Sequence, residues 1–83
     1  MGVNMTEALA ALDLPPAVKI QTLKLLARIS QAAGADELWR ASDRAAGFVL
    51  GLETVEVLDA TSIKALYEIF DVATTARRQE DAQ

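Results

Sequence analysis

The sequence predicts an all-α fold, in which a short first helix precedes a compact bundle of three longer helices. Apolar residues recur three or four positions apart in four segments, which is the spacing of one helix face. Strand-like alternation is confined to residues 52–59, and an isolated strand has no partner inside the chain. With 83 residues, 52% hydrophobic and 24% charged, the composition is that of one folded domain over residues 1–83.

The first helix is predicted to begin at Asn4 or Thr6 and to end near Asp13. Either residue is a favourable N-cap, and Glu7 stands three residues after Asn4, at the spacing of a capping box. Two adjacent prolines, 15 and 16, disfavour helical dihedrals in the residues before them, so the helix ends ahead of them. The apolar side of this helix consists of Met5, Leu9 and Leu12.

The second helix is predicted over residues 16–33, with Pro16 in its first turn and Gly34 as a left-handed stop. Its main apolar sector consists of Val18, Thr22, Leu25, Leu26, Ile29, Ala32 and Ala33. A second apolar patch consists of Ile20, Leu23 and Ala27. The polar side consists of Gln21, Lys24, Arg28 and Gln31. We interpret this side as a solvated face; the alternative is an ion-pair surface toward an acidic partner or a second copy.

The third helix is predicted from Glu37 to about Leu50, with Asp36 as its N-cap and Gly51 as its C-terminal stop. Its main apolar sector consists of Leu38, Ala41, Ala45, Phe48, Val49 and Leu52. The same sector continues around one flank through Trp39, Ala46 and Leu50. Sectors this wide exceed what one neighbouring helix covers, which favours self-association as a symmetric dimer.

Residues 52–59, LETVEVLD, are predicted to form an extended connection that lays Val55, Val57 and Leu58 on the core. The alternative is an edge strand contributed to a second subunit. Neither interpretation requires a sheet within one chain.

The last helix is predicted from Ala60 to about Arg78. Asp59 is its expected N-cap, ahead of Thr61 and Ser62. Its apolar sector consists of Ile63, Leu66, Ile69, Phe70, Ala73 and Ala76.

Both ends of the chain, residues 1–4 and 79–83, are expected to fray. Residues 1–4 fit either the ordinary start of a protein or an added leader ahead of Met5. The letters MGVNMT also match the N-myristoylation pattern, which is short enough to arise often by chance. With neither a signal-peptide pattern nor an apolar run near 18 residues, the expected location is the cytoplasm, with no membrane partner.

One stripe of the third helix is the main candidate site. At 100° per residue, one side of this helix carries Arg40, Arg44, Gly47 and Gly51. Small residues four apart let another backbone approach closely, and Trp39 near the helix start is a typical interface anchor. In one interpretation, these five residues form an interface in which the arginines pair with a partner's carboxylates. In the other, which the position of Gly51 at the expected end of the helix favours, Gly47 accommodates a helix of the same domain, Gly51 ends the helix and Trp39 lies at the core edge.

The chain contains no cysteine and no histidine. This excludes disulfides, thiolate nucleophiles, imidazole acid–base catalysis and zinc sites of the usual type. Carboxylates cluster at residues 36–37, where capping explains them, and at Glu53, Glu56 and Asp59, whose spacing matches no calcium loop. We therefore predict a protein that is not an enzyme, with no catalytic residue, metal or cofactor.

The net charge of −4 is unevenly distributed along the chain. Residues 1–35 carry three basic and two acidic residues, a net +1, whereas residues 36–83 carry five basic and ten acidic residues, a net −5. An acidic chain repels a phosphate backbone, so nucleic acid is a poor candidate partner. The turn at 33–36 is short enough for a helix-turn-helix, but Asp36 and Glu37 open the helix that would meet DNA.

The leading functional hypothesis is a non-catalytic protein–protein interaction module. It would act as a small regulatory or accessory subunit through a helical face, as a homodimer or with another protein. The first alternative is an acidic inhibitor that mimics phosphates and blocks a nucleic-acid-binding protein; a DNA-binding regulator is the second. The inhibitor requires an ordered carboxylate rim, formed by Glu53, Glu56, Asp59, Glu68 and Asp71.

Overall fold

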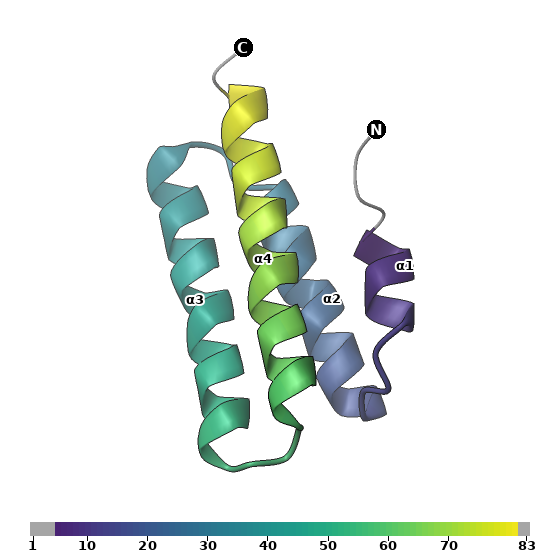
Figure 1. Ribbon diagram of the computed structural model, residues 1–83. Helices are drawn as coiled ribbons and strands as arrows, with labels where there is room; N and C mark the ends of the chain where they lie inside the picture. Colours follow the sequence, from purple (N-terminus) through teal and green to yellow (C-terminus); the bar gives the residue numbers. More distant parts are fainter. Residues whose placement is uncertain (1–4, 82–83) are drawn as a thin grey trace.

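The computed structural model describes residues 5–81, and this part of the chain contains four helices and no strand. The helices are α1 (Met5–Ala10), α2 (Pro16–Ser30), α3 (Ala35–Thr54) and α4 (Ala60–Asp81). The three long helices lie side by side with alternating directions (Figure 1) and measure 38 × 26 × 18 Å together with α1. The predicted all-α class, a short helix followed by a three-helix bundle, is confirmed.

The core lies where α2, α3 and α4 meet, and α1 adds one residue to it. The helical spacing of the apolar residues predicted these positions, because each helix buries one face against the others. The buried apolar residues are Leu9, Leu25, Ile29, Ala32, Leu38, Ala41, Ala45, Val49, Ile63, Leu66, Ile69 and Phe70. Thr22 is also fully buried, and its hydroxyl donates a hydrogen bond to the carbonyl oxygen of Val18 at 2.8 Å. That bond satisfies the polar atom locally.

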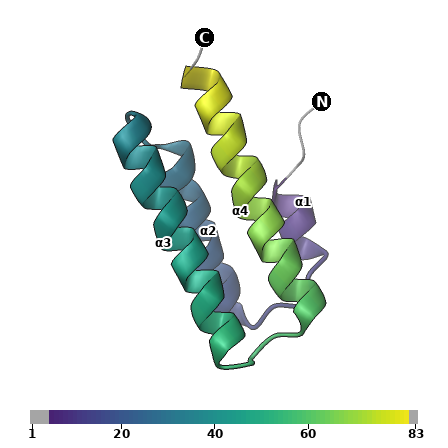
Figure 2. The same cartoon turned by 60° about the vertical axis from the view of Figure 1, so that its left-hand side comes forward.

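The short helix α1 packs against α4. Figures 1 and 2 both show α1 on the far side of the bundle from α3. The side of α3 that points away from the core is therefore not covered by α1.

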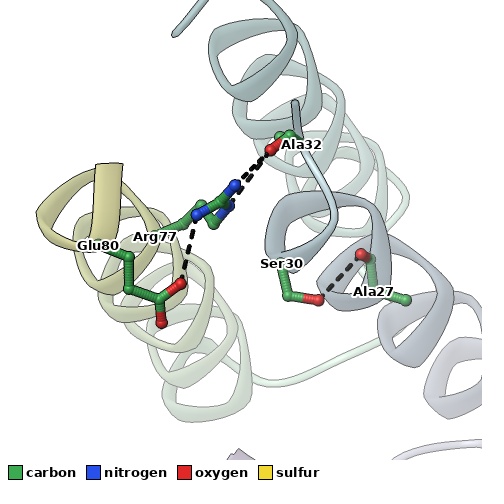
Figure 3. A network of polar contacts seen from close by, with 5 residues as sticks. All are labelled: Ala27, Ser30, Ala32, Arg77 and Glu80. Carbon is green, nitrogen blue, oxygen red and sulfur yellow. Dashed lines mark hydrogen bonds and ion pairs between the residues drawn. The ribbon is translucent and has the colours of Figure 1, made fainter. Parts of the chain in front are cut away.

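The end of α2 differs from the prediction. The helix ends at Ser30, and Gly34 is not a left-handed stop, because its backbone is extended with φ 177°. Instead, Nε and Nη2 of Arg77 donate hydrogen bonds to the carbonyl oxygen of Ala32 at 3.2 and 2.8 Å (Figure 3). A side chain from α4 thus satisfies the backbone where α2 passes into the turn.

The start of α3 also lies earlier than predicted. Gly34 occupies the N-cap position, and Asp36 lies within the first turn, so the prediction of Asp36 as the cap is wrong. An acidic side chain is favourable there because of the helix dipole. The carboxylate of Glu37 accepts a hydrogen bond from the N–H of Ala33, which resembles the return half of a capping box.

The end of α3 lies beyond Gly51, so the predicted stop at this glycine is wrong. Leu52 packs against the core, and the hydroxyl of Thr54 donates to the carbonyl oxygen of Leu50 at 2.8 Å. These contacts hold the last turn of the helix. The chain then passes through Glu56, whose φ of 55° is the only positive φ among the described residues.

Residues 55–59 form a turn, and not the extended connection that was predicted. Leu58 packs against the core as expected, but Val55 and Val57 are 65% and 51% exposed. The left-handed residue Glu56 lies between the two valines, where the chain turns from α3 into α4. Only one of the three apolar residues consequently reaches the core.

The N-cap of α4 is confirmed. Oδ1 of Asp59 accepts a hydrogen bond from the N–H of Ser62 at 2.8 Å. The helix continues to Asp81 and includes residues 79–81, which were expected to fray. Expectations for residues 1–4, including an N-cap at Asn4, and for residues 82–83 fall outside the described part of the chain.

Candidate interaction face of α3

The five predicted interface residues all lie in α3 and are all exposed. Trp39 is 58% exposed, so it does not belong to the edge of the core. The opposite side of the same helix carries the buried residues Leu38, Ala41, Ala45 and Val49. We define the outer face of α3 by its exposed residues between positions 39 and 51, which are Trp39, Arg40, Asp43, Arg44, Ala46, Gly47, Leu50 and Gly51.

The two glycines of the outer face border open space. A Cβ atom added to Gly47 or Gly51 would meet no atom within 4 Å, apart from the neighbouring backbone of its own helix. The prediction that Gly47 accommodates a helix of the same domain is therefore wrong. Gly51 does not end the helix, and neither residue has a positive φ. Nothing within the described chain requires glycine at either position.

Leu50 belongs to the outer face, although its place in the sequence suggested the flank of the core. It is 56% exposed and follows Trp39 by eleven residues, which is about three helical turns or about 16 Å along the axis. Ala46 lies between them and is also exposed. The eleven-residue spacing of two large apolar residues was the signal in the sequence that could have identified this second anchor.

A hollow of about 370 Å³ opens between α2 and α3, beside the outer face. Its lining residues are Arg28, Gln31, Glu37, Arg40, Ala41 and Arg44. We call this site the arginine hollow. Arg28 was predicted on the solvated face of the second helix, and only the packing of α2 against α3 brings it beside Arg40 and Arg44.

The arginine hollow gathers three positive charges without partners. Within residues 5–81, the side chains of Arg28, Arg40 and Arg44 make no hydrogen bond or ion pair, whereas Arg77 pairs with Glu80 at 3.3 Å. The one carboxylate in the lining, that of Glu37, accepts the N–H of Ala33. The guanidinium groups are therefore available to an anion.

Three of the five carboxylates that the inhibitor hypothesis requires lie around one hollow. Glu53, Glu56 and Glu68 line this second hollow of about 570 Å³, together with Lys64. Asp71 is not part of this lining, which also contains the side chains of Leu58, Ile63 and Tyr67. A lysine and apolar groups thus interrupt the negative surface.

The carboxylate of Asp59, another member of this set, accepts a hydrogen bond at the start of α4. Two hydrogen bonds from Ser62 hold the pKa of this carboxyl below its ordinary value. The side chain of Ser62 has the larger effect, and its backbone N–H has the smaller one. Both hydrogen bonds lower the pKa because they stabilise the charged form. The carboxylate of Asp59 therefore serves as the cap of α4.

No group of three or more acidic side chains in residues 5–81 is placed to hold a metal ion. No helix in this range has both the length and the apolar character needed to cross a membrane. Comparison of the chain with family models, curated proteins and solved structures finds no match.

Proposed function

We propose that this protein is a non-catalytic interaction module, a small regulatory or accessory subunit, that self-associates through the outer face of α3. The observation that carries this proposal is the open space around Gly47 and Gly51. A glycine inside a helix costs roughly 1 kcal/mol relative to alanine. Because no atom of residues 5–81 occupies this space, we infer that the close approach that glycine permits serves a helix from outside.

A second copy is the occupant that fits this face best. Close packing of two helix backbones requires small residues on both helices. A second copy supplies Gly47 and Gly51 in the same arrangement, so the face is complementary to itself. A contact between identical faces around a two-fold axis closes into a dimer, the commonest symmetric assembly of soluble proteins.

The apolar residues beside the glycines supply the energy of association. Trp39 and Leu50 are both more than half exposed, and each occurs twice in a symmetric dimer. Burial of apolar surface contributes about 25 cal/mol for each Å² removed from water. The glycines then allow these large side chains to reach the partner, and the exposed charges of Arg40 and Asp43 lie among them.

Sedimentation velocity over a concentration series tests the proposal. We expect a mass near twice the 8.9 kDa of the chain at high concentration, which falls toward the monomer mass on dilution. Leu50→Glu places a charge on the outer face and should give a monomer at every concentration. Gly47→Leu should do the same, because its side chain fills the space that the partner helix would occupy.

Val72→Glu is the matched control. Val72 is an exposed apolar residue, 40% accessible, and it lies in α4 outside the outer face. This variant should associate like the original chain. A chain that remains monomeric throughout the series, or equal loss of association in Val72→Glu and Leu50→Glu, would contradict the proposal.

A further inference from the structure

We infer that the arginine hollow is a binding site for a small ligand that carries phosphate groups. Arg40 and Arg44 belong both to the outer face and to the hollow, but the hollow is complete within one copy, where it opens between α2 and α3. Its volume of about 370 Å³ lies within the range of sites that hold small molecules.

The charge arrangement of the hollow leaves an excess of positive charge. Arg40 and Arg44 are four residues apart on one helix, and like charges at this spacing repel each other. Arg28 adds a third positive charge from α2, and none of the three forms an ion pair with a described side chain. In a chain of net charge −4, with twelve acidic residues available, this cluster stands out against its surroundings.

The donors of the hollow suit phosphate. Guanidinium groups present several N–H donors in a fixed plane, which match the oxygens of phosphate and carboxylate groups. Three arginines and one glutamate give the lining a net charge of +2, which is equal in magnitude and opposite in sign to the charge of a phosphate dianion. The side-chain amide of Gln31 adds a neutral donor to the lining.

The size and the surrounding charge favour a small ligand over a nucleic acid. Asp36 precedes Glu37, which lines the hollow, in the first turn of α3, and the whole chain is acidic. A long polyanion would therefore meet repulsion beyond the three arginines. A compact ligand such as a phosphate ester or a pyrophosphate places its charge within the hollow alone.

Titration with sodium pyrophosphate, followed through the Nε–H signals of the arginines by NMR, tests this inference. Sodium chloride at matched ionic strength and sodium citrate are the comparison titrants. We expect saturable shifts of the Arg28, Arg40 and Arg44 signals with pyrophosphate, little change at Arg78, and weaker binding of citrate. The same result should be obtained with Gly47→Leu, which separates this site from self-association.

Substitutions identify the residues responsible. Arg40→Gln/Arg44→Gln should weaken pyrophosphate binding by about tenfold or more, since each charged hydrogen bond contributes to affinity. Arg28→Gln should weaken it in the same direction from the other helix, and Arg78→Gln should leave it unchanged.

The inference is overturned by a response to pyrophosphate that does not saturate or that sodium chloride reproduces. Unchanged affinity in both Arg28→Gln and Arg40→Gln/Arg44→Gln would overturn it as well. Citrate that binds as tightly as pyrophosphate would overturn the assignment to phosphate and indicate a polycarboxylate site.

Discussion

The inner and outer faces of α3 both carry small residues, but in opposite surroundings. On the inner face, Ala45 is fully buried, and its small side chain fits where the helices of the bundle meet. On the outer face, Gly47 is exposed and borders space large enough for a side chain. The fold therefore explains the small residue at 45, whereas no contact among the described residues explains the one at 47.

The turn that follows α3 supports the same distinction. Glu56 has a left-handed backbone, where glycine is the favoured residue, while Gly47 and Gly51 have helical backbones that any residue can adopt. The glycines of α3 are thus not placed where the backbone requires them. Their common property is the absence of a side chain on an exposed face.

The largest difference in stability between the two faces is expected from substitutions at the adjacent residues Val49 and Leu50. Val49→Ala removes two methyl groups from a fully buried position and should lower the free energy of unfolding by about 2–3 kcal/mol. Leu50→Ala, on the outer face, should change it by less than about 0.5 kcal/mol. Urea unfolding of the dilute protein measures both, and equal losses would show that the two faces are not distinct.

A smaller effect, an increase in the free energy of unfolding, is expected from a substitution in the turn after α3. Glu56→Gly relieves the left-handed backbone and should raise the free energy of unfolding by about 1 kcal/mol. The same substitution three residues earlier, Glu53→Gly, lies inside α3 and should lower it by about 1 kcal/mol. Thermal unfolding of the pair checks the assignment, which fails if both variants shift in the same direction.

Replacement of the outer-face residue Gly47 by alanine should stabilise the fold, whereas glycine introduced beside it should destabilise the fold. Gly47→Ala should raise the free energy of unfolding by about 0.5–1 kcal/mol, since its methyl group meets open space and the helical backbone is retained. Ala46→Gly is the mirror substitution at the next exposed position and should lower it by a similar amount. Destabilisation by Gly47→Ala in dilute solution would mean that an atom of the same chain lies against this glycine.

The smallest effect concerns the start of α4. The pKa of Asp59 is lowered in the folded state, so its stabilising effect is complete above the ordinary pKa of aspartate. That effect is lost as the pH falls through the lowered, folded-state pKa. Asp59→Asn should therefore lower the melting temperature at neutral pH, and the difference from the original chain should shrink in acid. A difference that stays constant down to acid pH would exclude this role.

The sequence predicted the helices and their buried faces because each face follows from local spacing. Leu25, Val49 and Leu66 could be placed in the core without knowing which helix contacts which. The helix ends were harder to predict, since they depend on distant contacts. Arg77 bonds the carbonyl of Ala32 across 45 residues of sequence, and no local pattern near Gly34 reveals it.

The candidate site likewise has features that one helix determines and features that depend on packing between helices. The residues of the outer face share one helix, so the periodicity of α3 placed Arg40, Gly47 and Gly51 on one side. The space beside the glycines and the third arginine of the hollow, Arg28, depend on how α2 and α3 pack. Packing between helices is set by the whole core, which a single stretch of sequence does not encode.

Sedimentation equilibrium of Gly47→Ala/Gly51→Ala, with thermal unfolding of the same samples, tests the central claim most directly. The two methyl groups stabilise the isolated helix but keep a partner helix at a greater distance. We therefore predict a higher melting temperature in dilute solution together with weaker self-association than in the original chain. Self-association that is unchanged or stronger in this variant, or absent from the original chain, would contradict the assignment of the outer face of α3 as a self-association surface.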